Sequence, residues 1–241
     1  YPGFPGGIEG EKLIELFQLQ VARLGVEFMY EDVCCLDYTA GQFRAETRRA
    51  THLAPVAVIA SGTIGNTPQD LPTPPALRER VLTEIMPIKQ VSGKRVAIIG
   101  GGDLAFDYAL NLGRSNNVLI LNRSSERRCL PLLWERASHL PGVTYYQQCQ
   151  LTGIETAEGD AVGLNIISPA GREMVVCDYL VYAIGRRPNI EFYSEHVQQV
   201  AGELEQSGVL YRIGDVKNGI YRQVAIAVGD GILAAMQIIK R

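Results

Sequence analysis

The stretch RVAIIGGGDLAFDYA, residues 95–109, places three consecutive glycines between an apolar run and an amphipathic segment. The pattern G-x-G-x-x-A falls on Gly100, Gly102 and Ala105. Between a strand and a helix, the first glycine of this pattern permits a tight turn, the second lets the backbone approach a pyrophosphate, and the small third residue permits close packing. The helix N-terminus then faces the phosphates. The stretch predicts a dinucleotide-binding turn, with a tight turn that holds no ligand as the alternative.

The end of the next predicted strand, NVLILN, indicates which dinucleotide is bound. Folds that prefer NAD usually place Asp or Glu here to hold the ribose hydroxyls, whereas a 2′-phosphate needs cations. This strand ends in Asn122, and Arg123, Arg127 and Arg128 follow it. Guanidinium groups match phosphate geometry, so the sequence favours NADP(H). A solvated basic loop is the alternative reading.

The flanking patterns divide the chain near residue 80. Before it, residues 10–24 have the apolar spacing of an amphipathic helix. Strand-like patterns then follow at 26–30, 33–38, 41–49 and 55–62. Residues 64–75 carry four prolines and predict a linker or a boundary loop.

After residue 80, strands and helices alternate as in a parallel sheet with crossover helices. The predicted strands of this part are 95–100, 117–122, 143–147 and 179–185, the helices are 103–113 and 131–139, and a β-ribbon surrounds the turn at 169–172. A last strand at 208–215 and a helix at 220–240 close the chain.

Composition narrows the class of protein. A net charge of −3 with scattered basic residues gives no footprint for nucleic acid. No apolar run is long enough for a membrane helix, and we expect a cytoplasmic protein that does not associate with membranes. The five cysteines and three histidines show no metal-ligand spacing, so no metal site is predicted.

Three further stretches carry a family resemblance: residues 1–28, YAIGRRPN at 182–189, and IGDVKNGIYRQVAIAVGDGILAA at 213–235. With the glycine turn, they resemble the thioredoxin-reductase-like flavoproteins of the pyridine nucleotide-disulfide oxidoreductase superfamily, over nearly the whole chain. The resemblance implies a two-domain α/β, Rossmann-like FAD/NAD(P)-binding fold. In it, an NADP(H) domain at 80–192 is inserted into a discontinuous FAD-type domain formed by 1–79 and 193–241.

The resemblance also assigns cofactor-binding residues for FAD and NADP. On the NADP side they are Gly100, Gly101, Gly102, Asp103, Ala105, Arg123, Arg128, Ile184 and Gly185. On the FAD side, Gly214 and Asp215 match the turn at the ribityl chain. Arg222, Gln223 and Val224 match the helix start against the isoalloxazine ring, and Ser61 and Gly62 match a Thr-Gly pair near the flavin.

Two departures from the family pattern stand out. The region that carries the family's redox-active C-x-x-C reads LTEIMPIKQVSGKRV here, residues 82–96, without cysteine. Thiol-disulfide exchange at that position is therefore excluded. Cys34 and Cys35 are adjacent in a strand pattern and point to opposite faces, so we expect a structural role for them. Cys129 follows Arg128, whose charge can lower a thiol pKa, but a single cysteine in a basic loop is usually inert and no reactive role is assigned to it. The family's N-terminal glycine turn for the FAD diphosphate is also missing, and we expect a segment upstream of Tyr1.

The sequence therefore predicts an NADPH-dependent flavoprotein oxidoreductase, with no side-chain acid or base assigned to the chemistry. Hydride passes from NADPH to FAD and on to an acceptor other than an internal C-x-x-C disulfide, as in ferredoxin-NADP reductases of this type. The acceptor is a small redox protein, a quinone-like molecule or a disulfide small molecule. The alternative is a non-catalytic NADP(H)-binding redox sensor or partner-binding module with a degenerate FAD site. The resemblance implies a homodimer.

Overall fold

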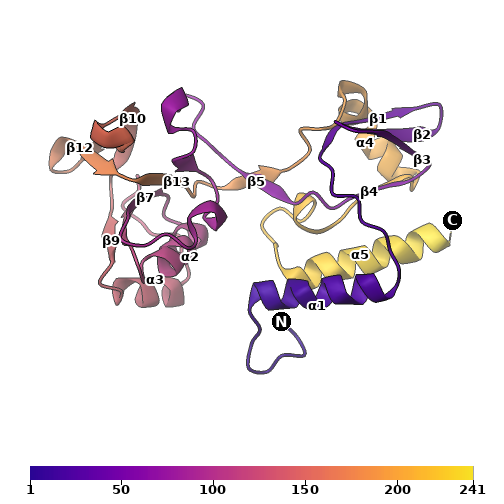
Figure 1. Ribbon diagram of the computed structural model, residues 1–241, viewed down its shortest axis with the longest axis horizontal. Coiled ribbons are helices and arrows are strands. Elements are labelled where there is room, and N and C mark those ends of the chain that lie inside the picture. The colour runs from indigo at the N-terminus through magenta and orange to yellow at the C-terminus, as the bar shows by residue number, and fades with distance from the viewer. Residues whose placement is uncertain (241) are drawn as a thin grey trace. The chain divides into compact units, whose positions relative to one another are not determined.

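The computed structural model describes residues 1–240, which divide into two compact units (Figure 1). One unit comprises residues 64–187, and the other comprises 1–63 together with 188–240. The middle of the chain is thus inserted into a discontinuous unit, as predicted. Residues 64–79 and 188–192 belong to the opposite units from those that the sequence analysis gave them.

The inserted unit is built on a five-stranded, all-parallel sheet. Its strand order is β6 (Val81–Leu82), β13 (Tyr179–Tyr182), β7 (Arg95–Ile99), β8 (Asn117–Leu121) and β9 (Val143–Tyr146). The chain runs outward from β7 through β8 to β9 and then returns to the other side of β7 as β13. The direction of winding therefore reverses between β7 and β13, the point where open α/β sheets bind ligands.

Side-chain alternation along the strands gives the sheet two buried faces. Val96 and Ile98 pack under α2 (Asp103–Leu112) and α3 (Pro131–Ser138), whereas Ala97 packs under an antiparallel meander. The meander consists of β10 (Gln150–Thr156), β11 (Val162–Ser168) and β12 (Gly171–Cys177). The rings of Phe106, Trp134 and Tyr145 pack on one another between α2, α3 and β9. This three-layer packing fixes the ends of the strands in space.

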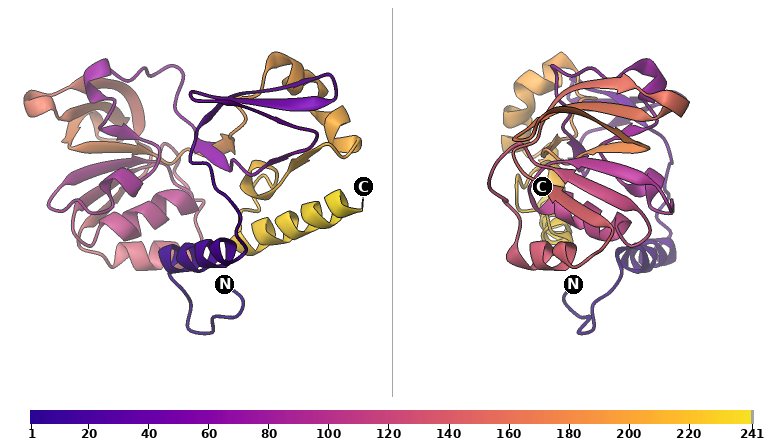
Figure 2. Two further views of the ribbon diagram at one scale, coloured as in Figure 1. Left: turned by 45° about the vertical axis from the view of Figure 1, so that its right-hand side comes forward. Right: turned by 90° about the vertical axis from the view of Figure 1, so that its left-hand side faces the viewer.

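The discontinuous unit has a smaller core. Its antiparallel strands are β1 (Val33–Thr39), β2 (Gln42–Thr47) and β3 (Thr51–Ala54), and β4 (Ala57–Ile59) pairs in parallel with β15 (Leu210–Arg212). Its helices are α1 (Gly10–Arg23), α4 (Glu195–Gln206) and α5 (Val224–Ile239). Leu36, Phe43, Val197 and Leu210 are the centre of this core. Figure 2 shows α1 and α5 as separate long helices of this unit.

Short elements complete the chain. The strands β5 (Thr63–Gly65) and β14 (Arg186–Pro188) pair with each other and contain the residues at which both chain crossings occur. The 3-10 turns are η1 (Pro75–Leu77), η2 (Met86–Ile88), η3 (Glu158–Asp160) and η4 (Gly214–Val216).

Several elements differ from the sequence-based expectation. Residues 26–30 form no strand, because alternating apolar residues give a strand only where a neighbouring strand accepts the backbone hydrogen bonds. The helix α4 and the strands β3, β5, β6, β10 and β14 were not predicted. Within residues 1–240, no helix combines the length and apolar character that crossing a bilayer requires.

Candidate nucleotide-binding site

A cavity of about 570 Å³ opens at the carboxyl ends of the parallel strands, within the inserted unit. It lies where the winding of the sheet reverses, between the residues that follow β7 and those that follow β13. Its lining includes most of the predicted NADP residues: Gly100, Gly101, Gly102, Arg123, Arg128, Ile184 and Gly185. The sequence-predicted nucleotide residues therefore meet at one site.

The three glycines at the end of β7 have three different roles. Gly100 has φ +150°, and a Cβ added there would lie 2.4 Å from the carbonyl oxygen of Ala183. A Cβ on Gly101 would lie 2.5 Å from the side chain of Asn122. Gly102, the N-cap of α2, has no atom within 4 Å of an added Cβ. Gly100 and Gly101 thus permit packing, whereas Gly102 leaves bare backbone facing the cavity, as a pyrophosphate at a helix N-terminus requires.

Asp103 and Ala105 do not line the cavity. The Asp103 carboxylate accepts a hydrogen bond from the backbone N–H of Leu130 at 2.7 Å, and so ties α2 to the start of α3. Ala105 is completely buried in the core beneath α2. Both residues support the turn rather than face a ligand.

The loop after β8 brings two guanidinium groups to the cavity. Arg123 and Arg128 both line it, and neither side chain has an ion pair or hydrogen bond within residues 1–240. The backbone N–H of Arg128 donates to the carbonyl of Gly101 at 2.8 Å, which folds the loop back onto the glycine turn. Two unpaired cations beside bare helix-terminal backbone suit a phosphorylated nucleotide.

The third arginine of the loop has another role. The guanidinium of Arg127 lies 4.1 Å from the ring centre of Trp134 in α3, and Arg127 does not line the cavity. Its charge therefore stabilises the packing of the loop on α3. The pKa of the neighbouring Cys129 thiol is raised by burial and by the charge of Asp103, so this thiol is not activated by the arginines of the loop.

Three ionisable residues of the cavity escaped the sequence analysis. Glu126 and Asp70 add carboxylates to the lining, and Cys149 adds a buried thiol. Burial, with a smaller contribution from the charge of Glu173, raises the pKa of Cys149, so this thiol is not activated as a nucleophile. Sequence reasoning had one signal for Glu126, its position in the loop that carries Arg123, Arg127 and Arg128.

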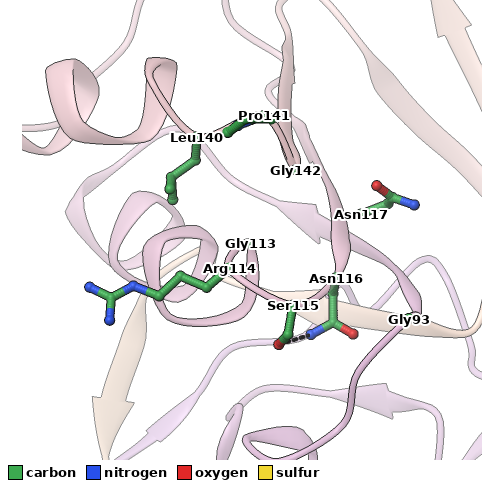
Figure 3. A pocket seen from close by; sticks show the side chains of 9 residues that line it. All are labelled: Gly93, Gly113, Arg114, Ser115, Asn116, Asn117, Leu140, Pro141 and Gly142. Atoms are coloured by element: carbon green, nitrogen blue, oxygen red, sulfur yellow. Dashed lines mark hydrogen bonds between the residues drawn. The ribbon is translucent and has the colours of Figure 1, made fainter.

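A second hollow, of about 490 Å³, lies at the opposite, amino-terminal ends of the strands (Figure 3). Its most buried polar side chain, Asn116, is fully engaged: its amide donates to the carbonyls of Val91 and Leu112 and accepts from the N–H of Lys94. The Arg114 side chain extends away from Asn116. This hollow offers no convergent polar groups to a ligand.

In the discontinuous unit, Ser61 and Gly62 form a turn that is bound to Asn189. The Ser61 hydroxyl donates to the Asn189 carbonyl at 2.5 Å, and the Asn189 N–H donates to the Gly62 carbonyl at 3.0 Å. Gly62 has φ +68°, a backbone conformation that favours glycine. The turn is thus fixed by its own chain before any cofactor contacts it.

The Gly214–Asp215 turn is held against the N-terminal half of α5. The N–H of Gly214 donates to Oδ2 of Asp230 at 2.9 Å, and the amide of Asn218 donates to the same oxygen at 2.6 Å. These hydrogen bonds lower the pKa of Asp230, a residue that sequence reasoning missed. Asp215 is half-buried, and its side chain has no hydrogen bond or ion pair within residues 1–240.

The start of α5 follows the predicted pattern. Gln223 is the N-cap, its side chain makes no capping hydrogen bond, and Val224 is the first helical residue after Arg222 and Gln223. Amides of a first helical turn stabilise nearby negative charge, as a reduced flavin ring presents. The Asp215 carboxylate and the backbone of this helix start are the groups here that could hold a cofactor. Within the described residues of this unit, no glycine-rich turn joins a strand to a helix, which is the arrangement that would hold an FAD diphosphate.

Within the inserted unit, Glu84 ties the segment at 82–96 to α2 and to β14. The Tyr108 hydroxyl donates to Glu84 Oε2 at 2.8 Å, and Arg186 forms a close ion pair with Glu84 Oε1. Burial and this hydrogen bond raise the pKa of Tyr108 well above its usual value. An ionic and hydrogen-bonded cluster thus anchors the segment in which the sequence lacks the cysteine pair.

Comparisons with known proteins agree with this geometry. Residues 10–231 match the family model described as pyridine nucleotide-disulphide oxidoreductase. A thioredoxin reductase of Chlamydia pneumoniae is 25% identical over 98% of this chain and 81% of its own length, and one of Schizosaccharomyces pombe is 28% identical over 98% and 79%. The structure of Lactococcus lactis thioredoxin reductase has a TM-score of 0.80 at 21% identity, covering 100% of this chain and 84% of the other. The predicted two-domain Rossmann-like fold is confirmed.

Proposed function

Because the chain belongs to the pyridine nucleotide-disulphide oxidoreductase family, we propose that it passes electrons from NADPH through FAD to an acceptor other than an internal cysteine pair. The resemblance to thioredoxin-reductase-like flavoproteins is confirmed. So are the predictions of an NADPH-dependent FAD oxidoreductase and of FAD and NADP as cofactors, at the level of the family. The acceptor and the residues that serve the cofactors are the parts that we propose.

One observation carries the nucleotide half of the proposal. The cavity at the carboxyl ends of the strands holds Arg123 and Arg128, both without protein partners within residues 1–240, beside the open backbone of Gly102. The arginines would hold the 2′-phosphate, and Gly102 with the N-terminus of α2 would hold the pyrophosphate. Ile184 and Gly185 line the part of the cavity that follows β13.

The flavin half rests on the turn and the helix start of the other unit. Asp215 would hold the ribityl chain, and the first turn of α5 would stabilise the reduced ring. FAD supplies hydride acceptance and electron transfer when it is bound. Asp230 keeps Asp215 in place because it bonds both Gly214 and Asn218 of the same turn.

The states of the cysteines support an external acceptor. Cys177 is buried, and burial raises the pKa of its thiol to about 12. The pKa values of Cys35, Cys129 and Cys149 are raised chiefly by burial too. Cys34, the exposed thiol, donates its S–H to the carbonyl of Glu46. All five are free thiols and none lies in the segment at 82–96, so an internal dithiol relay there has no residues to use.

The test is anaerobic reduction of the purified full chain loaded with FAD. NADPH should bleach the flavin absorbance, and a thiol titration before and after reduction should give the same number of free thiols. Substituting Cys34→Ser and Cys35→Ser together should leave the rate of bleaching unchanged. A larger number of free thiols after reduction would show that the chain's own cysteines accept the electrons, which would contradict the proposal.

The same experiment also tests the alternative function, a non-catalytic NADP(H)-binding protein. A chain that binds NADP but takes up no FAD would be a nucleotide-binding sensor or partner-binding module. Acceptor classes are then compared by turnover with a small redox protein, a quinone and a small-molecule disulfide under NADPH.

We also propose that the chain acts as a homodimer in the cytoplasm. Ile232, Met236 and Ile239 are exposed on α5, and Ile14 and Leu19 are exposed on α1. Exposed apolar side chains that gather on one face commonly mark association surfaces. Light scattering on the eluted protein measures the mass directly, and a monomer at micromolar concentration would contradict the proposal.

A further inference from the structure

Glu126 adds an acidic residue to the lining of the cavity that holds the two unpaired arginines. It lies in the loop 123–128, and the cavity is lined by Arg123, Ser124, Glu126 and Arg128 together. The sequence indicated no carboxylate at the ribose position, because the predicted strand ends in Asn122, the residue directly after β8. The folded loop supplies one from four residues further along the chain.

The backbone of Glu126 is fixed on both sides. The Asn122 amide donates to the Glu126 carbonyl at 2.9 Å, and the Glu126 N–H donates to the Ser124 hydroxyl at 3.2 Å. Asn122 is itself buried, and its amide also donates to the Tyr145 hydroxyl while its carbonyl oxygen accepts from the Ser124 N–H. The loop therefore returns to the end of β8, where a dinucleotide fold holds the adenosine ribose.

The carboxylate of Glu126 is available to a ligand. It forms no ion pair or hydrogen bond with any residue of 1–240, and in particular none with Arg123 or Arg128. A carboxylate accepts hydrogen bonds from a ribose 2′-hydroxyl but repels a 2′-phosphate, whereas guanidinium groups attract the phosphate. The cavity thus presents opposing groups to the one position at which NAD and NADP differ.

We propose that Glu126 sets the nucleotide preference of this cavity. It accepts a hydrogen bond from the adenosine 2′-hydroxyl of NAD(H) and repels the 2′-phosphate of NADP(H). The chain therefore uses both nucleotides, and its preference for NADP(H) is weaker than the two arginines alone would give. This inference rests on the proposed function, because it assumes that the cavity binds a nicotinamide dinucleotide.

The test compares NADP⁺ and NAD⁺ binding to the full chain with Glu126→Gln. Calorimetry gives both dissociation constants without turnover, and quenching of Trp134, the single tryptophan, gives a second readout because Arg127 of the same loop lies over its ring. Removing a like charge beside a partly exposed phosphate should strengthen NADP⁺ binding about fivefold. Replacing the charged acceptor by a neutral amide oxygen should weaken NAD⁺ binding about threefold, since one hydrogen bond to the ribose is weakened. The ratio of the two affinities should thus rise about fifteenfold.

Asp70→Asn is the matched control, because Asp70 lines the same cavity from outside the arginine loop. It should change both affinities alike and leave their ratio within twofold of the original. An unchanged ratio in Glu126→Gln would overturn the inference. Weaker NADP⁺ binding in that variant would also overturn it, because the carboxylate would then serve to orient the arginines. If neither nucleotide binds the original chain, the proposed function itself fails.

Discussion

The side-chain amide of Asn122 donates a hydrogen bond to the backbone carbonyl of Glu126 at 2.9 Å. This contact closes the loop that carries Arg123 and Arg128, and it starts from a buried residue that directly follows β8. The same amide meets the Tyr145 hydroxyl at 2.9 Å. Asn122 is therefore a positioning residue: it need not touch the nucleotide to decide where Arg123 and Arg128 lie.

Substituting Asn122→Ala should weaken NADP⁺ binding about tenfold and lower the free energy of unfolding by about 2 kcal/mol. The physical reason is that the Glu126 carbonyl, the Tyr145 hydroxyl and the Ser124 N–H all lose their partner, and an orphaned buried polar group costs about 1–3 kcal/mol. Calorimetry and urea unfolding measure the two effects. Equal affinity in the variant would show that the loop closes without the amide.

The glycine turn offers a pair of variants with opposite outcomes. Gly100→Ala should destabilise the fold by about 3 kcal/mol or more, because its Cβ would lie 2.4 Å from the Ala183 carbonyl at φ +150°. Gly102→Ala meets no atom within 4 Å and should keep its stability within about 1 kcal/mol. It should still lose NADP⁺ affinity at least tenfold, because the methyl group would stand between the backbone and the pyrophosphate. A Gly102→Ala variant with unchanged affinity would place the pyrophosphate elsewhere.

Much of the inserted unit follows from local pattern in the sequence. The glycine turn and α2 were predictable because most apolar residues of the helix fall on its buried face, and Gly102 is the N-cap of the helix. Arg123 was identifiable because it follows closely after the end of a strand, and Arg128 because it belongs to the same cluster of arginines. Glu126 was not, since only the folded loop shows that a residue four positions beyond Asn122 returns to the cavity.

The discontinuous unit was less predictable for a physical reason. The helix α4 begins at Ser194, whose hydroxyl accepts from the Val197 N–H at 3.1 Å and donates to Asp37 at 2.6 Å. The cap and the apolar spacing to Leu204 were visible signals, but the Asp37 contact that fixes the helix is remote in sequence. The strand expected at 26–30 is wrong, because strand pairing depends on a neighbour that periodicity does not reveal.

Substituting each of the three arginines of the loop should have different effects on nucleotide affinity and on stability. Arg123→Ala and Arg128→Ala should each weaken NADP⁺ binding about tenfold and NAD⁺ binding much less, because a charge-assisted hydrogen bond to the 2′-phosphate contributes about 1.5–3 kcal/mol. Arg127→Ala is the control: it should cost about 0.5–1 kcal/mol of stability through loss of the Trp134 contact, with little change in affinity. Titrations at low and high salt should show a shallower salt dependence only for the first two variants.

Asp230 should make the stability of the Gly214–Asn218 turn depend on pH. Its pKa is lowered in the folded chain, first by the hydrogen bond from Asn218, then by that from the Gly214 N–H, with Lys217 contributing favourable charge at 3.8 Å. A carboxylate with a lowered folded-state pKa stabilises the fold above its unfolded pKa of about 3.9, and this contribution is lost as the pH falls through the folded value. Asp230→Asn should therefore be about 1–2 kcal/mol less stable than the original chain at pH 7. This difference should shrink as the pH falls below about 4, as urea unfolding at a series of pH values would measure.

The control is Asp160→Asn, which replaces an exposed carboxylate in η3 and should show no such difference at either pH. A gap for Asp230→Asn that persists unchanged at pH 3 would mean that the turn is held by shape alone, without help from the charge.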